Sequence, residues 1–568
     1  MSDAAECAVR LYDENDRPIA EHALERRDDG LFVRDLEGVG SGALYRFVLG
    51  DRALPDPYAR FLPRGVHGPA MVVESDYEWR HPSVSRSLAE HVIYELHVGT
   101  FTPEGTYAGA AERLERLTEL GVTAVELMPI AAFDGTRGWG YDGVAHYAPF
   151  APYGTPDALR AFVDRAHGLG LSVLLDVVYN HFGPAGNYLS AYDARYFTRD
   201  VASPWGDAPN YAFEPMRRYA IENALYWLEE FRFDGLRLDA THAVIDHSAR
   251  HVLAELAEEV AALRPKRLLV AEDERNEPSL VTRAGLDALW ADDFHHAARV
   301  TLTGERDGYY GAYEPGAATV ARTIRRGWLY EGQRNPVSGN ARGANADELS
   351  AERFVYCIQN HDQVGNRALG DRLHDAVSSE AYLSVSLLLL FLPMTPLVFM
   401  GQEWAASSPF LYFTDHEAEL GRAITEGRRR EFAAFGAFSE SACEVPDPQA
   451  LATFERSRLD WNERTMPEHA RVLEFYRSAL LLRREDAVLA EPSRERLRCT
   501  ALGDVLAVER WRNDERRLLL VNFGAHDVSV SELVTQLDFD GARSLLASAP
   551  HVGFDFFAAK AAVVLAKP

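Results

Sequence analysis

The chain has 568 residues, of which 47% are hydrophobic and 26% are charged. This length predicts two or three domains, and the composition is that of a globular protein that folds throughout. Acidic residues outnumber Lys and Arg by 86 to 59, which gives a formal net charge of −27 and argues against nucleic-acid or membrane partners.

The first part of the chain predicts a β-rich unit followed by a barrel. Residues 1–86 alternate short apolar and polar segments divided by Gly, Pro and Asp, a pattern that predicts a small β-sandwich. Eight apolar runs follow, each as short as a strand buried on both faces. These runs are residues 92–96, 124–128, 172–178, 235–239, 267–272, 286–290, 354–358 and 397–400.

Helical patterns separate these runs, at residues 109–120, 156–169, 215–231 and 248–263. The alternation of strand and helix predicts an α/β fold in which residues 87–485 form a (β/α)₈ TIM barrel with loop insertions.

The remaining segments complete this prediction. The polar, Gly-rich residues 303–349 predict a loop excursion near the open face of the barrel. After a helix around 468–484, strand patterns predict a compact C-terminal β domain over residues 486–568. The strand patterns lie at 505–508, 518–521 and 561–565.

Cysteine usage and hydropathy predict a cytoplasmic protein. The cysteines have neither the paired spacing of a metal site nor the density of a disulfide framework. They are Cys7, Cys357, Cys443 and Cys499. The first residues contain no secretory signal pattern. The most apolar stretch, 387–400, contains two prolines and is too short to span a bilayer, so we expect a buried helix end, a turn and a barrel strand.

Carboxylates stand where the predicted strands end. Asp239 and Glu272 close two of the runs, Asp362 follows a third, and a fourth run contains Asp176. The carboxyl ends of parallel barrel strands open toward the substrate. Cleavage of a glycosidic bond needs one carboxylic acid to protonate the leaving oxygen and one carboxylate to attack the anomeric carbon. A single buried acid is usually a cap or half of an ion pair, but this set predicts a glycoside hydrolase.

Four segments carry a family resemblance. Residues 176–181 (DVVYNH), 235–240 (GLRLDA), 271–273 (AED) and 360–363 (NHDQ) resemble, in order, the four sequence regions of the α-amylase superfamily, glycoside hydrolase family 13. Within it, longer segments are similar to the malto-oligosyltrehalose trehalohydrolase family. These segments are 94–106, 138–143, 290–296, 401–404 and 412–416. The resemblance implies hydrolysis of the α-1,4 bond next to the terminal trehalose of maltooligosyl trehalose.

The resemblance implies a retaining double displacement. Asp239 would be the nucleophile, Glu272 the general acid/base, and Asp362 a ligand of substrate hydroxyls that helps to distort the ring. Arg237 precedes Asp239 by two residues and lies on the same side of the strand. We therefore expect its guanidinium to hold Asp239 ionised.

Candidate contacts to the sugar bound at the cleavage point, the −1 subsite, come from the same motifs. The resemblance implies that His181 and His361 hydrogen-bond this sugar, and Asp176 is placed with them. Tyr141 lies on a Gly-rich loop and is expected to form the floor of the subsite, because aromatic faces pack against sugar C–H groups. Trp139 on the same loop is a candidate contact, with simple loop packing as the alternative.

Residues 292–296, Asp-Asp-Phe-His-His, combine acids and imidazoles as metal sites do. Neighbouring side chains on an extended backbone point in opposite directions, so we expect no metal ion there. The resemblance instead implies a loop beside the departing trehalose. Its candidate contacts are Trp290, Asp293, His295 and His242.

The chain departs from the family pattern in two places. It begins downstream of an aromatic-rich Trp-Ala-Pro turn of the family's sandwich, so we expect an incomplete N-terminal domain. The segment after His181 is short, so we expect the calcium-binding insertion of many amylases to be reduced and no metal ion or other cofactor to be needed.

Two other functions stay open at this level. An α-glucan branching enzyme shares the sandwich and barrel, but passes the glucosyl group to a sugar hydroxyl instead of water. A glycan-binding protein with an inactive barrel would keep the fold without the chemistry, and the intact acids argue against it. Each alternative takes a neutral α-glucan, and the sequence identifies no protein partner.

Overall fold

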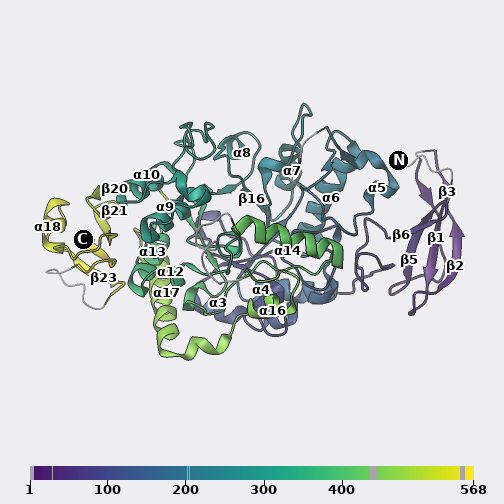
Figure 1. The fold of residues 1–568 in the computed structure, drawn as a ribbon, viewed down its shortest axis with the longest axis horizontal. Helices are drawn as coiled ribbons and strands as arrows, with labels where there is room; N and C mark the ends of the chain where they lie inside the picture. The colour runs from purple at the N-terminus through teal and green to yellow at the C-terminus, as the bar shows by residue number, and fades with distance from the viewer. Residues whose placement is uncertain are drawn as a thin grey trace.

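The computed structural model describes residues 6–28, 30–200, 203, 205–433, 445–549 and 557–567. A central barrel carries a β-rich unit at each end, with the N-terminal unit and the C-terminal unit on opposite sides of the molecule (Figure 1). Cys7, Cys357 and Cys499 are free thiols, and Cys443 lies outside the described residues.

Parallel strands form the predicted barrel, which closes in the order β12-β15-β16-β17-β18-β19-β8-β9. The strands are β8 Ile93–Leu96, β9 Ala124–Leu127, β12 Ser172–Val177, β15 Gly235–Leu238, β16 Leu268–Glu272, β17 Ala288–Trp290, β18 Phe354–Tyr356 and β19 Thr395–Phe399. Almost all their residues are buried, because one face fills the barrel and the other meets the helices. The TIM barrel and its strands are confirmed.

Helices cover the outside of the barrel. The main ones are α4 Pro156–Gly168, α6 Glu214–Glu230, α7 Val252–Ala261 and α13 Ser379–Phe391. Thr155 and Ser378 cap α4 and α13, because each side chain accepts a hydrogen bond from a backbone N–H of the first turn. The predicted helix at 109–120 is divided into α2 Tyr107–Ala111 and α3 Leu114–Leu120. None of the described helices combines the length and apolar composition needed to cross a bilayer.

Two segments predicted as loops contain helices. Residues 292–296 begin helix α9, Asp292–Thr303, and the stretch 303–349 contains helix α10, Ala317–Arg326. The prediction for 303–349 is wrong at α10, which lies between Gly316 and Gly327 and buries apolar side chains on one face. Acidic residues in the first turn of α9 complement the positive end of the helix dipole.

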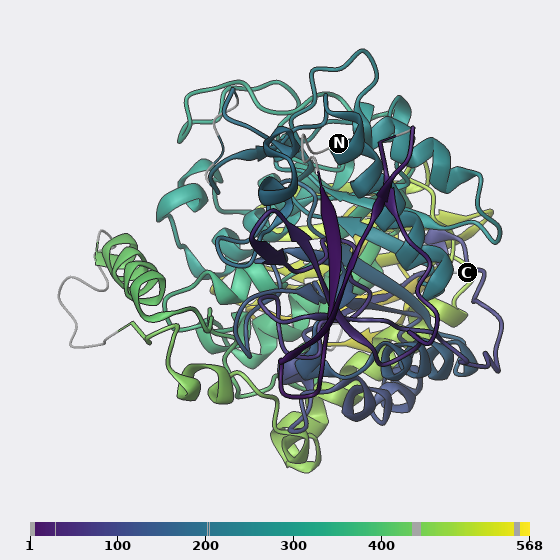
Figure 2. The ribbon, with the colours of Figure 1, turned by 90° about the vertical axis from the view of Figure 1, so that its right-hand side faces the viewer.

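Antiparallel sheets flank the barrel. The N-terminal sheet contains β1 Cys7–Tyr12, β2 Pro18–Ala23, β5 Leu44–Leu49, β6 Arg52–Leu54 and β7 Ala70–Met71, and a separate ribbon pairs β3 Glu25–Arg26 with β4 Phe32–Val33. Figure 2 shows these strands in front of the barrel. Helix α17, Pro467–Glu485, leads to the C-terminal sheet. The strands of this sheet are hydrogen-bonded in the order β20-β21-β22-β24-β23. Its strands are β20 Leu497–Leu502, β21 Val505–Arg512, β22 Glu515–Asn522, β23 Arg543–Ala547 and β24 Ala562–Lys567.

Candidate active site

The barrel brings the predicted acids together at one of its own ends, where its strands terminate. Asp239 follows β15, Glu272 is the last residue of β16, and Asp176 lies near the end of β12. Asp362 lies in the short helix α11, His361–Gly365, shortly after β18. Because the strands are parallel neighbours in the closed sheet, their carboxyl ends open on the same face.

One guanidinium holds three of these acids together. Arg237 is fully buried, and its Nη1 donates to Asp176 Oδ2 at 2.7 Å and to Asp239 Oδ1 at 3.0 Å. Its Nη2 lies 2.7 Å from Glu272 Oε2, which also accepts a hydrogen bond from the backbone N–H of Ala240 at 2.9 Å. Asp239 and Glu272 therefore face the same cation from two sides.

Burial and the neighbouring charges shift the pKa values of Asp239 and Glu272 in opposite directions. Burial, followed by the charge of Glu272, raises the pKa of Asp239 well above its ordinary value, and Arg237 opposes this rise without cancelling it. Burial also acts to raise the pKa of Glu272, but Arg237 and the N–H of Ala240 outweigh it and lower the pKa. Arg237 contacts Asp239 as expected, while burial and the charge of Glu272 act against the ionised form of Asp239. The two carboxyl groups lie against the same cation, so their titrations are coupled.

A second ion pair orients the other side of the site. His361 Nδ1 lies 2.5 Å from Glu95 Oε1, and the backbone N–H of His361 donates to Glu95 Oε2 at 3.0 Å. Both side chains are buried. Burial alone would lower the pKa of His361, but the carboxylates of Asp362 and Glu95 raise it to about 10. His361 is therefore an imidazolium whose Nε2 faces Tyr141 and Asp362, at 2.7 and 3.4 Å.

Glu95 was not among the sequence-predicted site residues. It lies inside β8, and a carboxylate within an otherwise apolar barrel strand was the signal that could have found it. Glu95 touches the acids only through His361, so we regard it as a positioning residue.

We expect Glu95→Gln to lower kcat/KM by about tenfold or more, the scale of one charge-assisted hydrogen bond. Because the carboxylates raise the folded pKa of His361, its charged form persists below about pH 10 and is lost above it. Without the charge of Glu95, His361 loses its proton at a lower pH. The reduction of kcat/KM in Glu95→Gln should therefore become larger as the pH rises. The pH profile of kcat/KM, together with the thermal midpoint, checks this. A loss that is the same at every pH would contradict the role.

The two aromatic residues of the loop before β11 (Ala145–Pro149) have different surroundings. Tyr141 donates to Asp176 Oδ2 at 2.6 Å and stacks on the ring of His361, with centroids 5.1 Å apart. Trp139 is only 6% exposed, and its indole N–H donates to the carbonyl of Leu411 at 2.9 Å. Trp139 therefore packs behind His361, which agrees with the loop-packing alternative.

Two more aromatic side chains border the acids. Trp290 is buried at the end of β17, with the guanidinium carbon of Arg237 4.3 Å from its ring centroid. The ring of His181 stacks on Trp205 at 4.5 Å, and burial lowers the pKa of His181 to about 4, so this imidazole is neutral. Trp205 is 46% exposed and was not a sequence candidate.

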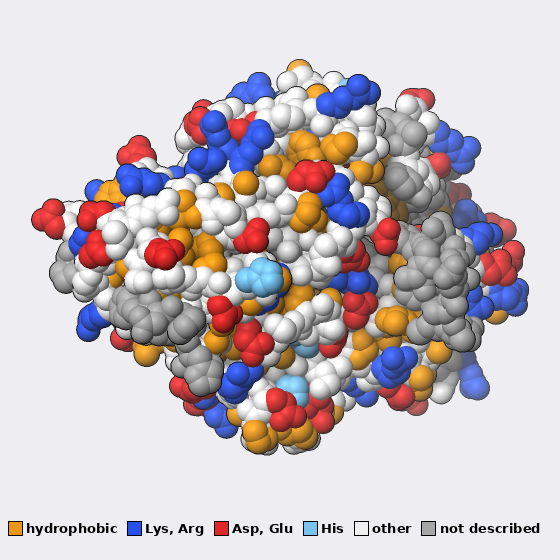
Figure 3. All heavy atoms as spheres, turned by 60° about the vertical axis from the view of Figure 1, so that its left-hand side comes forward, with side chains coloured by type: hydrophobic (Ala, Val, Ile, Leu, Met, Phe, Trp, Pro, Cys, Tyr) orange, Lys and Arg blue, Asp and Glu red, His pale blue; other side chains and the backbone are white. Residues whose placement is uncertain are grey.

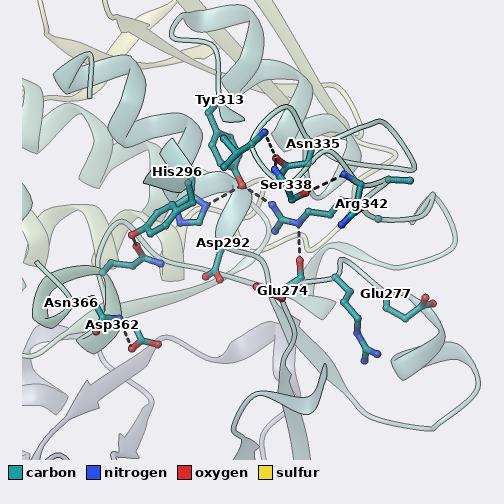
Figure 4. A pocket seen from close by; sticks show the side chains of 17 residues that line it. Glu274, Glu277, Asp292, His296, Tyr313, Asn335, Ser338, Arg342, Asp362 and Asn366 are labelled. Atoms are coloured by element: carbon teal, nitrogen blue, oxygen red, sulfur yellow. Dashed lines mark hydrogen bonds between the residues drawn. The ribbon is translucent and has the colours of Figure 1, made fainter. Parts of the chain in front are cut away.

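A cavity of about 730 Å³ opens beside Asp362 (Figure 4). Its wall is rich in carboxyl, amide and hydroxyl groups and in tyrosine rings, which suits a polyhydroxylated ligand. Residues on the wall include Glu274, Asp292, His296, Tyr309, Tyr313, Asn335, Arg342, Asp362, Gln363 and Asn366. Burial, followed by the charge of Glu272, raises the pKa of Asp292 to about 7.

The helical register of α9 decides which of its residues reach this cavity. Asp292 and His296 line it, as residues four apart on one helix face do. Asp293 is fully buried and accepts hydrogen bonds from Tyr313, Asn276 and the backbone of Leu329, so it braces the cavity wall. His295 is buried in the core. The sequence predicted Asp293 and His295 as contacts, but the residues of this segment that line the cavity are Asp292 and His296.

His242 lies at the edge of this group. Its Nε2 is 3.9 Å from Glu274 Oε1, and its side chain is 27% exposed. The Glu274 side chain is itself largely exposed and lines the cavity. His242 is therefore accessible from the solvent side of the site.

Asn180 is the residue of its motif that would be expected to contact a calcium ion. The amide of Asn180 is buried and has no hydrogen-bond partner among the described residues. Calcium takes six to eight oxygen ligands, commonly including carboxylates. No group of three or more His, Cys, Asp or Glu in the described part of the chain is arranged to hold a metal ion. No step below uses one.

Comparisons with known proteins identify several relatives. Residues 75–204 match the family described as the catalytic domain of alpha amylase. The malto-oligosyltrehalose trehalohydrolase of Deinococcus radiodurans is 54% identical over 553 residues, covering 94% of this chain and 90% of that protein. The protein of that name from Arthrobacter ramosus is 44% identical over 500 residues, covering 84% of this chain and 85% of that protein. A crystal structure described as a putative alpha amylase from Salmonella typhimurium has a TM-score of 0.91 at 39% identity, covering 100% of this chain and 97% of that one.

Proposed function

Since the chain belongs to the malto-oligosyltrehalose trehalohydrolase family of the α-amylase superfamily, we propose that it hydrolyses the α-1,4 bond next to the terminal trehalose of maltooligosyl trehalose. Trehalose and a shortened glucan are the products. The observation that carries the chemistry is that Asp239 and Glu272 share the guanidinium of Arg237 beside a cavity lined by polar groups.

The reaction proceeds in two displacements. Asp239 attacks the anomeric carbon while Glu272 donates a proton to the leaving oxygen of trehalose, which leaves a glycosyl ester on Asp239. Glu272 then accepts a proton from water, whose oxygen attacks the same carbon and releases Asp239. The first step needs Asp239 as a carboxylate and Glu272 as a carboxylic acid, so the enzyme must hold a proton on Glu272 when substrate is bound. A guanidinium that contacts both groups supports the short spacing, about 5 Å, of retaining enzymes.

The surrounding residues divide into two subsites. Tyr141, Asp176, His181, His361 and Asp362 hold the sugar whose bond breaks. Tyr141 provides the ring face, and the imidazolium of His361 fixes Tyr141 and Asp362. Trp139 and Trp290 support this group by packing.

The departing trehalose occupies the cavity beyond Asp362. Asp292 and His296 line it directly, and His242 reaches its edge from the solvent side. Asp293 acts on it only through the wall that it braces.

We place the enzyme in the cytoplasm as a cofactor-free hydrolase. Three free cysteines among the described residues support a reducing compartment. On the face shown in Figure 3, acidic and basic side chains are interspersed rather than gathered into a basic surface. This supports a neutral glucan, and neither nucleic acid nor a membrane, as the partner.

Product analysis tests the assignment. We expect chromatography to show trehalose release from maltooligosyl trehalose, with maltooligosaccharide and amylopectin as poor substrates, because the cavity must accept the α,α-linked disaccharide. Maltose or glucose released rapidly from maltohexaose, with no trehalose from the capped analogue, would overturn the specificity and leave the superfamily intact.

Two other outcomes correspond to the alternatives. A changed iodine stain of amylopectin without trehalose release would indicate a branching enzyme. Glucan affinity without turnover in any assay would indicate a binding protein.

A further inference from the structure

A second pocket, of about 240 Å³, lies at the opposite end of the barrel from the acids. Val92, Thr123 and Pro393 line it. Val92 and Thr123 immediately precede β8 and β9, and Pro393 lies two residues before β19, so this is the amino end of the strands. The other wall comes from α17 and the segment 489–492 that leads to the C-terminal sheet. Figure 1 shows α13 and α17 on the side of the barrel that faces the C-terminal sheet.

The pocket is strongly basic in a protein whose net charge is −27. Four arginines line it, Arg86, Arg483, Arg484 and Arg510. The single carboxylate on its wall is Glu90, whose Oε2 already accepts hydrogen bonds from the N–H and the hydroxyl of Ser87, at 2.9 and 2.6 Å. The positive charge is therefore not balanced from within the pocket.

The two inner arginines are buried without an acidic partner. Arg483 and Arg510 are 9% and 1% exposed, and neither forms an ion pair with a carboxylate of the described residues. Arg483 donates instead to the backbone carbonyls of Leu390, Leu392 and Met394, at and just after the end of α13. Arg510 donates to the carbonyls of Phe391 and Glu491. Burial lowers the pKa of Arg483 to about 10. Burial and then Arg483 lower the pKa of Arg510 to about 9, against the carboxylates of Asp486 and Glu491, which act to raise it.

Capping of α13 explains these hydrogen bonds, but carbonyl dipoles carry only partial charge and leave two cations side by side in a low dielectric. Capping also does not explain the two arginines at the outer edge of the pocket, which we call its rim. Arg86 and Arg484 are exposed there, and Arg484 pairs with the exposed Glu485 on its own helix, at 3.0 Å, a type of pair that contributes little. Arg86 Nη2 donates to the carbonyl of Gly170 at 3.2 Å, and the remaining N–H groups of both arginines are available to an anion.

We propose that this pocket binds a small phosphorylated organic molecule. Arg86, Arg483 and Arg484 contact the phosphate, because planar guanidinium groups match its oxygens in pairs. Arg510, which is almost fully buried, contributes charge from beneath. The apolar part of the wall, which includes Val92, Leu480 and Leu489, covers the carbon skeleton.

A ligand bound in this pocket would link the barrel to the C-terminal sheet, because Arg483 belongs to α17 and Arg510 to β21. A ligand that binds only the folded protein raises the thermal midpoint in a concentration-dependent way. The catalytic acids lie at the other end of the strands, so changes at the rim should leave kcat unaltered. The proposal therefore stands or falls independently of the substrate assignment.

The test measures binding to the full chain at constant ionic strength. Calorimetry and thermal midpoints are compared for glucose 6-phosphate, inorganic phosphate and glucose. We expect saturable binding of glucose 6-phosphate, weaker binding of inorganic phosphate, and none of glucose. The double variant Arg86→Gln/Arg484→Gln changes only exposed side chains, and its affinity should fall at least about tenfold. The matched control, Arg116→Gln/Arg250→Gln, changes two other exposed arginines and should bind normally.

Three results would overturn the proposal. These are no saturable binding of either phosphate, equal binding by the rim variant and the wild type, and equal loss in the control variant. If inorganic phosphate binds as tightly as glucose 6-phosphate, the pocket recognises phosphate alone, and the organic part of the ligand is not recognised.

Discussion

Replacing Glu272 with Gln is expected to reduce turnover of the natural substrate by about 10²- to 10⁴-fold, the scale of losing a general acid. The amide keeps the size of the side chain but cannot protonate the leaving oxygen. Arg237 and the N–H of Ala240 would still contact it, so folding should be little affected. Steady-state kinetics and the thermal midpoint measure the two effects.

The pattern across substrates identifies the role. A substrate with an activated leaving group needs less protonation, so its first step should suffer far less in Glu272→Gln. Azide should partly rescue the second step, because it attacks without a general base. Equal slowing of activated and natural substrates at an unchanged midpoint would show that Glu272 is not the acid.

The neighbouring acids are weaker candidates on structural grounds. Asp273 is buried and accepts hydrogen bonds from Thr241 and Arg275, and Glu274 is 73% exposed. Glu274→Gln is therefore a control that should leave the protonation step intact.

Replacing Asp239 with Asn is expected to lower turnover by about 10⁴-fold or more, because the amide cannot form the glycosyl ester. A slow fluorosugar substrate should trap that ester in the wild type. Mass spectrometry should then locate the adduct on the peptide that contains Asp239. An adduct on another carboxylate would remove this role from Asp239.

Asp362→Asn provides the matched comparison. Asp362 is held by Asn366 and lies beside His361, and it does not contact Arg237 in the way that Asp239 does. The Asp362 variant should still form the adduct on Asp239, more slowly, whereas Asp239→Asn should form none.

The amino-acid sequence by itself determined the barrel and its acids. Strands buried on both faces must be unbroken apolar runs, so β12, β15 and β16 could be read directly, and a carboxylate at the end of such a run must emerge at the open face. The predicted helix at 109–120 and the loop at 303–349 were less accurate. Glycines such as Gly316 and Gly327 mark ends of helices as well as loops, and a local pattern does not separate the two.

Only the tertiary structure decided how the site is charged and which residues face the cavity. The pKa values of Asp239 and Glu272 depend on burial and on Arg237, and the charge of His361 depends on Glu95, which is 266 residues away along the chain. The register of α9 turned Asp292 rather than Asp293 to the cavity. Each outcome is set by groups distant in sequence that folding brings within a few ångströms, where Coulomb interactions and desolvation are strong, and no local pattern encodes those distances.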